Sequence, residues 1–104
     1  MPDRDYSHVP LSTKLGARAG THVTVFFTTS AAELGRRFPA LKRTLDGADG
    51  LWIAWPKKAS GVKTDLTFDA VQSTGLDAGL VDNKSCAIDD TWQALRFVIR
   101  LSDR

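Results

Sequence analysis

The segment between residues 56 and 67 holds the residues of this chain that are best suited to chemistry. Three lysines and three hydroxyl side chains occur there, and the candidate ligand-binding residues are Lys57, Lys58, Ser60, Lys63 and Thr67. The segment follows the apolar run Leu51–Trp55 and precedes an expected helix, so it should lie where the carboxyl end of a strand meets the amino end of a helix. Ammonium groups and free helix amides attract anions at such places. One interpretation of the loop is therefore that it binds a small anion or a nucleotide.

The opposing interpretation of this loop is purely structural. Its lysines can form a solvated basic surface, and Thr67 can serve only as a helix cap. Asp65 favours this interpretation, because its carboxylate can pair with the lysines or interact with the helix dipole. The sequence leaves both interpretations open.

Two acidic groups near the carboxyl terminus suggest paired carboxylates for acid–base chemistry. Asp82, Asn83 and Lys84 interrupt an expected strand, and Asp89 and Asp90 lie in the turn that follows it. Aspartate and asparagine are ordinary turn residues, and charges on an outer strand discourage aggregation through the sheet edge. No histidine or serine stands at a position typical of a catalytic pair. We therefore assign these residues a structural role and predict no catalytic residue.

The single cysteine, Cys86, is expected to be a buried hydrophobic side chain and not a nucleophile. It alternates in phase with Leu80 and Ile88 along an expected strand. One cysteine forms no internal disulfide, and His8 and His22 lie at no metal-ligand spacing from it. We therefore expect no metal site.

Composition and charge limit the class of protein further. The 104 residues are 42% hydrophobic and 25% charged, which suits a single globular domain. The net charge is +2 without a run of five or six like charges, so we expect no nucleic-acid partner. The polar start Met1–Ser7 is no signal peptide, and no stretch of about 18 apolar residues occurs. The sequence therefore predicts a cytoplasmic protein without a membrane partner.

The first half of the chain is expected to form an arm, a strand and a helix. Residues 1–21 are predicted to be a partly ordered arm, and residues 22–104 a single α/β domain that begins with a strand at 22–28. Ser30 and Glu33 have the spacing of a capping box, which predicts a helix start. Four apolar residues then fall on one stripe of that helix: Leu34, Phe38, Leu41 and Leu45. Pro39 interrupts the stripe, so we expect a kink or two short helices.

The second half is expected to contain three strands and one helix. Residues 51–55 are apolar throughout, which predicts a central strand buried on both faces. Thr67 can cap a second helix that ends near Gly75 or Gly79. Strands at 80–88 and 92–101 should form a closing antiparallel hairpin. The three tryptophans, Trp52, Trp55 and Trp92, are expected to lie chiefly in the core, although one of them can anchor an interface.

This order of elements predicts an α/β fold with a small mixed sheet. Two right-handed crossovers in one direction place both helices on the same face of the sheet. The opposite face is then bare, although the strands offer apolar side chains to it. We expect residues 1–21, a second copy of the chain or a different protein to cover that face.

Two long motifs carry a resemblance to a known family: DGLWIAWPKKASGVKTDLT at 49–67 and GLVDNKSCAIDDTWQALRFVIR at 79–100. Over about residues 11–104 the chain resembles a bacterial family of unknown function that is frequent in actinobacteria. Longer members look like reduced class I S-adenosylmethionine-dependent methyltransferases, in which this portion forms the second half of the sheet. The resemblance implies that the last strand inserts beside residues 51–55, which gives a strand order of 1-2-4-3 in space.

The chain departs from these longer relatives near its first strand. In them, further strands and helices separate a segment like KLGARAGTHV from one like TVFFTTSAAEL, whereas here residues 14–23 run directly into residues 24–34. The resemblance thus implies a truncated member without the cofactor-binding half. A nucleotide site of this architecture also needs a glycine-rich turn after a strand, and Gly16 and Gly20 precede the first expected strand. We expect no cofactor and carry over no methyltransferase residue.

The sequence favours a non-enzymatic module that self-associates as a homodimer or binds another protein. Its uncovered sheet face or the edge of its first strand would form the interface. The alternative is a small-anion or nucleotide-binding protein, with residual enzyme activity as an option, that uses the loop Lys57–Thr67. A third hypothesis is a decayed gene product whose fold has no selected role.

Overall fold

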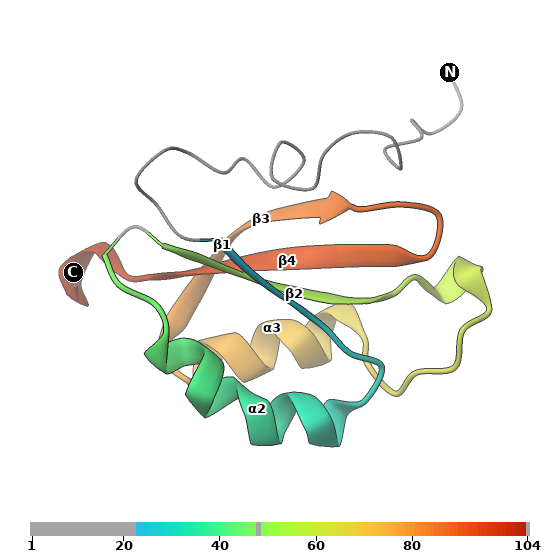
Figure 1. Cartoon of the computed structure of the whole chain (residues 1–104), viewed down its shortest axis with the longest axis horizontal. Helices are drawn as coiled ribbons and strands as arrows, with labels where there is room; N and C mark the ends of the chain where they lie inside the picture. The colour runs from blue at the N-terminus through green and yellow to red at the C-terminus, as the bar shows by residue number, and fades with distance from the viewer. Residues whose placement is uncertain (1–22, 48, 104) are drawn as a thin grey trace.

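A four-stranded mixed sheet with two helices forms the part of the chain that the computed structural model describes, residues 23–47 and 49–103 (Figure 1). The elements in chain order are β1 (Val23–Phe27), α2 (Ala31–Arg43), β2 (Gly50–Pro56), a 3₁₀ turn (Lys58–Ser60), α3 (Phe68–Asp77), β3 (Leu80–Ala87), β4 (Trp92–Ile99) and a second 3₁₀ turn (Leu101–Asp103). The predicted arm at residues 1–21 lies outside the described residues.

The strands are ordered β1-β2-β4-β3 in the sheet. β1 and β2 are parallel, because α2 connects them as a crossover, whereas β4 is antiparallel to both β2 and β3. The hairpin of β3 and β4 therefore inserts its second strand next to the central β2. This arrangement confirms the α/β class, the mixed sheet and the 1-2-4-3 order.

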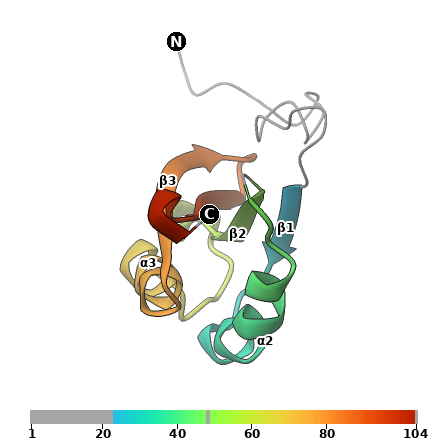
Figure 2. The same ribbon diagram turned by 90° about the vertical axis from the view of Figure 1, so that its left-hand side faces the viewer.

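Both helices lie on one side of the sheet, as two perpendicular views agree (Figure 2). α2 lies below β1 and β2, and α3 lies below β3 and β4. The main core fills the space between helices and sheet, and its largest members are Trp55, Phe97 and Phe38. All seven residues of β2 are buried, which confirms the expectation of a central strand covered on both faces.

Side-chain caps begin both helices where the sequence predicts them. The hydroxyl of Ser30 accepts a hydrogen bond from the Glu33 amide at 3.1 Å, and the Thr67 hydroxyl accepts one from the Ala70 amide at 3.1 Å. α3 passes through Gly75 and ends at Asp77, and the left-handed Gly79 (φ 89°) follows it. The prediction that this helix ends near Gly79 is therefore confirmed, and the alternative end near Gly75 is wrong.

α2 is one continuous helix across Pro39, so the expected division into two short helices is wrong. A proline inside a helix leaves the carbonyl four residues earlier without its donor, and that carbonyl belongs to Gly35. Gly35 and Pro39 are both exposed, so water can hydrate the freed carbonyl. Leu34 and Phe38 still reach the core on the opposite side of the helix.

A bulge in β3 changes the face on which Cys86 lies. Pairing with β4 shifts register between Asp82 and Lys84, so Asn83 is an extra residue on β3. Leu80 belongs to the main core on the helix side, whereas Cys86 is partly buried in a second cluster on the other face. The expectation that Cys86 and Leu80 share one face is therefore wrong, because each extra residue reverses the alternation.

Candidate functional site

A cavity of about 560 Å³ opens where β2 ends and α3 begins. Its wall is largely apolar, and it includes Trp55 from the end of β2 and Phe68 from the first turn of α3. Their ring centroids lie 6.2 Å apart at an angle of 59°. Pockets that bind small molecules have this size and this mixture of aromatic walls with a few polar groups.

The structure brings three of the five predicted ligand residues to this cavity. Lys58, Lys63 and Thr67 line it. Lys57 lies at an adjoining hollow beside Cys86, which shares Trp55, Phe68 and Gln93 with the cavity. Ser60 lines neither of these two hollows.

The hydroxyl of Ser60 holds the turn of the loop together. It donates to the Lys57 carbonyl at 2.7 Å and accepts from the Val62 amide at 3.2 Å. The Lys57 amide donates to the Thr91 carbonyl at 2.7 Å, which ties the start of the loop to the β3–β4 turn. Ser60 and the backbone of Lys57 therefore shape the loop that carries the cavity.

Two long-range hydrogen bonds fix the other end of the loop to the chain between β1 and α2. The Thr64 hydroxyl donates to the Thr29 carbonyl at 2.7 Å, and Asp65 Oδ1 accepts from the Ala31 amide at 2.8 Å. Asp65 thus places its negative charge at the amino end of α2, where the helix dipole favours it. Its carboxylate is directed to a backbone amide and has no bond to a lysine among the described residues.

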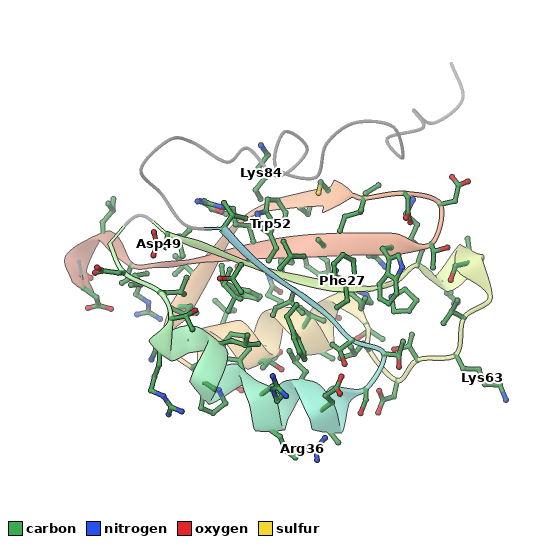
Figure 3. All side chains as sticks on the ribbon, in the orientation of Figure 1. Phe27, Arg36, Asp49, Trp52, Lys63 and Lys84 are labelled. Atoms are coloured by element: carbon green, nitrogen blue, oxygen red, sulfur yellow. The ribbon has the colours of Figure 1, made fainter. Side chains whose placement is uncertain are left out.

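The two cavity lysines remain available to a ligand. Lys58 and Lys63 are exposed, and the ammonium group of neither makes a hydrogen bond or ion pair within residues 23–47 and 49–103. Figure 3 shows the Lys63 side chain reaching into solvent from the loop. No acidic side chain lines the cavity in the described part of the chain, whereas Lys58 and Lys63 bring positive charge to its rim.

Sequence reasoning missed the aromatic and amide groups of the cavity. Phe68 follows the cap Thr67 in the first turn of α3, and it is 42% exposed. Gln93 comes from β4, and it reaches the cavity because β4 lies beside β2. A signal existed only for Phe68, since an apolar residue directly after a helix cap lies at the helix end next to the loop.

Two of the acidic residues near the carboxyl terminus, Asp82 and Asp89, have structural partners. Asp82 Oδ2 accepts from Gln72 Nε2 at 3.2 Å, and Asp89 Oδ1 accepts from the amides of Thr91 and Trp92 at 2.8 Å each. Asp89 therefore closes the hairpin turn. The described residues contain no cluster of three His, Cys, Asp or Glu side chains that is suited to a metal ion. None of the described helices is long and apolar enough to cross a membrane.

The two edges of the sheet differ in their protection against pairing with another strand. β3, at one edge, carries Asp82, Lys84 and the bulge at Asn83, which are features that discourage edge pairing. β1, at the other edge, has the sequence VTVFF, without a charge, a proline or a bulge. Among the described strands β1 pairs with β2 alone, and each of its residues is at least partly exposed.

The sheet face away from the helices is buried at its centre. Trp52, Ala54 and Ala94 point to it, yet none is more than 1% exposed. The Arg96 side chain lies across Gly50 on this face. It is so close that a β-carbon on Gly50 would overlap the guanidinium group. Exposed apolar surface remains at β1, where Phe27 is 42% exposed. The Phe27 ring packs edge-on against the Trp92 ring, with ring centroids 5.1 Å apart.

Comparisons of the chain with protein-family models, with curated proteins and with solved structures found no match. Functional proposals for this chain therefore rest on the cavity and on the β1 edge.

Proposed function

We propose that the chain is a non-enzymatic, self-associating module that forms a homodimer through antiparallel pairing of its β1 strands. The observation that carries this proposal is the contrast between the two sheet edges. β3 carries charges and a bulge that oppose pairing, whereas the apolar β1 has neither. An unprotected edge strand is a template for another strand, and a second copy of β1 supplies one of matching character.

The backbone of β1 has suitable groups on its outer side. The Thr28 amide donates to the Ala54 carbonyl of β2 at 3.0 Å. Because backbone groups alternate along a strand, Thr24 and Phe26 also face β2, whereas Val23, Val25 and Phe27 direct their amides and carbonyls outward. A two-fold axis at Val25 pairs all five residues of β1 with those of the second copy and extends the sheet across the dimer.

The side chains of β1 also favour a partner strand. Val23, Val25 and Phe26 are half-buried and Phe27 is exposed, so pairing removes apolar surface on both faces of the sheet from water. The centre of the face away from the helices is buried, as Trp52 shows with no exposed surface. The edge therefore offers more accessible apolar surface than the middle of that face.

The family resemblance agrees with this choice of edge. In the longer methyltransferase-like relatives, the additional strands precede the segment that forms β1 here. They would adjoin β1, so a truncated chain leaves this edge without its neighbours. We infer that the chain is derived from such a scaffold and uses the edge for self-association. A cytoplasmic location stays a prediction of the sequence.

Sedimentation velocity across a concentration series tests the dimer. We expect a dimer at high micromolar concentration for the native chain and a monomer for Val25→Pro. Proline at position 25 removes an outward amide but leaves the bonds to β2 intact. Val25→Thr keeps both the amide and the β-branched shape, so it is the matched control and should dimerise. A native chain that stays monomeric, or a Val25→Pro variant that is folded and still dimeric, contradicts the proposal.

A further inference from the structure

We propose that the cavity between the end of β2 and the start of α3 binds a small aromatic anion, a planar ring that carries one carboxylate, sulfonate or phosphate group. This site is separate from the β1 edge and does not depend on the dimer. The observation behind this proposal is that apolar side chains and two lysines line the same cavity.

The apolar side of the cavity is unusually open to water. Phe68 and Val62 both line it and are each 42% exposed, although both side chains are hydrophobic. Trp55 lies behind them and is almost fully buried. A planar ring inserted against Phe68 and Val62 would remove their surfaces from water, which is the main source of affinity in small-molecule pockets.

The charged side of the cavity is positive. Lys58 and Lys63 stand at the rim without a partner among the described residues, and the described lining has no carboxylate. Asp65, the nearest acid along the chain, is committed to the Ala31 amide at 2.8 Å. A single anionic group on the ligand would therefore find two lysines at the rim and no carboxylate in the cavity wall.

Two neutral polar groups can orient the ligand. The Thr67 hydroxyl accepts the cap bond from Ala70, which leaves its own hydrogen free to donate. Gln93 Nε2 lies 3.5 Å from the Pro56 carbonyl, a long and weak hydrogen bond that a ligand can replace. These groups add direction to a site whose affinity comes from burial and charge.

A bare inorganic anion fits this cavity poorly. Its wall is formed mainly by apolar side chains, which cannot replace the water around a phosphate ion. Nucleoside triphosphates carry more negative charge than two exposed lysines can neutralise. The volume of about 560 Å³ is well suited to a ligand of one or two fused rings.

Amide chemical shifts during titration with 2-naphthoate test the site in the full chain. We expect shifts confined to the residues around Val62, Phe68 and Gln93. The neutral probe 2-naphthalenemethanol should bind about threefold to tenfold more weakly, because it lacks the charge that two exposed lysines attract. Inorganic phosphate should leave the same amides nearly unchanged.

Variants separate the roles of ring and charge. The double change Lys58→Gln and Lys63→Gln should remove the preference for naphthoate over the neutral probe, whereas Lys84→Gln on β3 should keep it. Phe68→Ala should weaken both probes alike while the remaining spectrum stays unchanged. Equal affinity for charged and neutral probes, phosphate shifts as large as those of naphthoate, or no shift at millimolar naphthoate overturns the proposal.

Discussion

The ring of Phe97 on β4 packs directly against the backbone of Gly75 in α3, so that a β-carbon on Gly75 would overlap the ring. Phe97 is fully buried, and Phe38 of α2 holds it from another side with ring centroids 5.9 Å apart at 88°. The ring therefore has little room to retreat. The missing side chain of Gly75 allows α3 to approach the sheet closely at this point.

Replacing Gly75 by alanine should destabilise the fold. Overlap with Phe97 should lower the free energy of unfolding by about 1–3 kcal/mol, even though alanine is the better helix former. Gly35→Ala is the matched control, because nothing lies within 4 Å of a β-carbon there. It should raise the free energy of unfolding by about 0.5–1 kcal/mol. Urea unfolding measures both, and a neutral Gly75→Ala variant would mean that the core around Phe97 is loose.

Local signals in the sequence predicted most of the elements. Ser30 and Thr67 each begin a helix, because a hydroxyl that caps the first turn leaves a short-range pattern in the chain. The apolar run at 51–55 likewise identifies the central strand. The strand order, however, followed from the family resemblance, since alternation within a strand says nothing about its neighbours.

Features that depend on distant residues were not predicted. Gly75 has the sequence character of a helix end, and only the position of Phe97 explains why the helix continues through it. The bulge at Asn83 reverses the face of Cys86 without a local signal. The same holds for the cavity, where Gln93 joins the loop only because β4 inserts beside β2.

Removing the carboxylate of Asp65 should loosen the loop that carries the cavity. Asp65→Ala deletes the bond to the Ala31 amide and the charge at the amino end of α2. We expect the free energy of unfolding to fall by about 1 kcal/mol, and by less for Asp65→Asn, which keeps an acceptor oxygen. Hydrogen exchange should speed up in the loop at 61–66. Unchanged stability and exchange in both variants would show that this tie contributes nothing.

Trp52 should tolerate loss of its indole nitrogen. Its Nε1 is buried and has no hydrogen-bond acceptor in the structure described for this chain. Trp52→Phe removes that unpaired donor, a gain of about 1–3 kcal/mol that offsets the lost apolar contact. We expect a net change within about 1 kcal/mol, against a loss of about 2–5 kcal/mol for Leu95→Ala in the main core. Thermal unfolding compares the two, and a large loss for Trp52→Phe would show that its N–H is satisfied in solution.

The proposed dimer should become tighter as salt is added. The Arg37 guanidinium lies over the Phe26 ring of β1, 5.8 Å from its centroid, and pairing through a two-fold axis brings the Arg37 side chains of both copies to one face near the junction. Their repulsion is screened by salt, so the dissociation constant should fall by about threefold to fivefold between about 0.05 and 0.5 M salt. Arg37→Gln should abolish this dependence. Arg36→Gln should keep it, because Arg36 points away from the sheet (Figure 3). Sedimentation velocity at the two salt concentrations measures this change. A dimer that weakens with salt would have opposite charges at its interface, which contradicts pairing through β1.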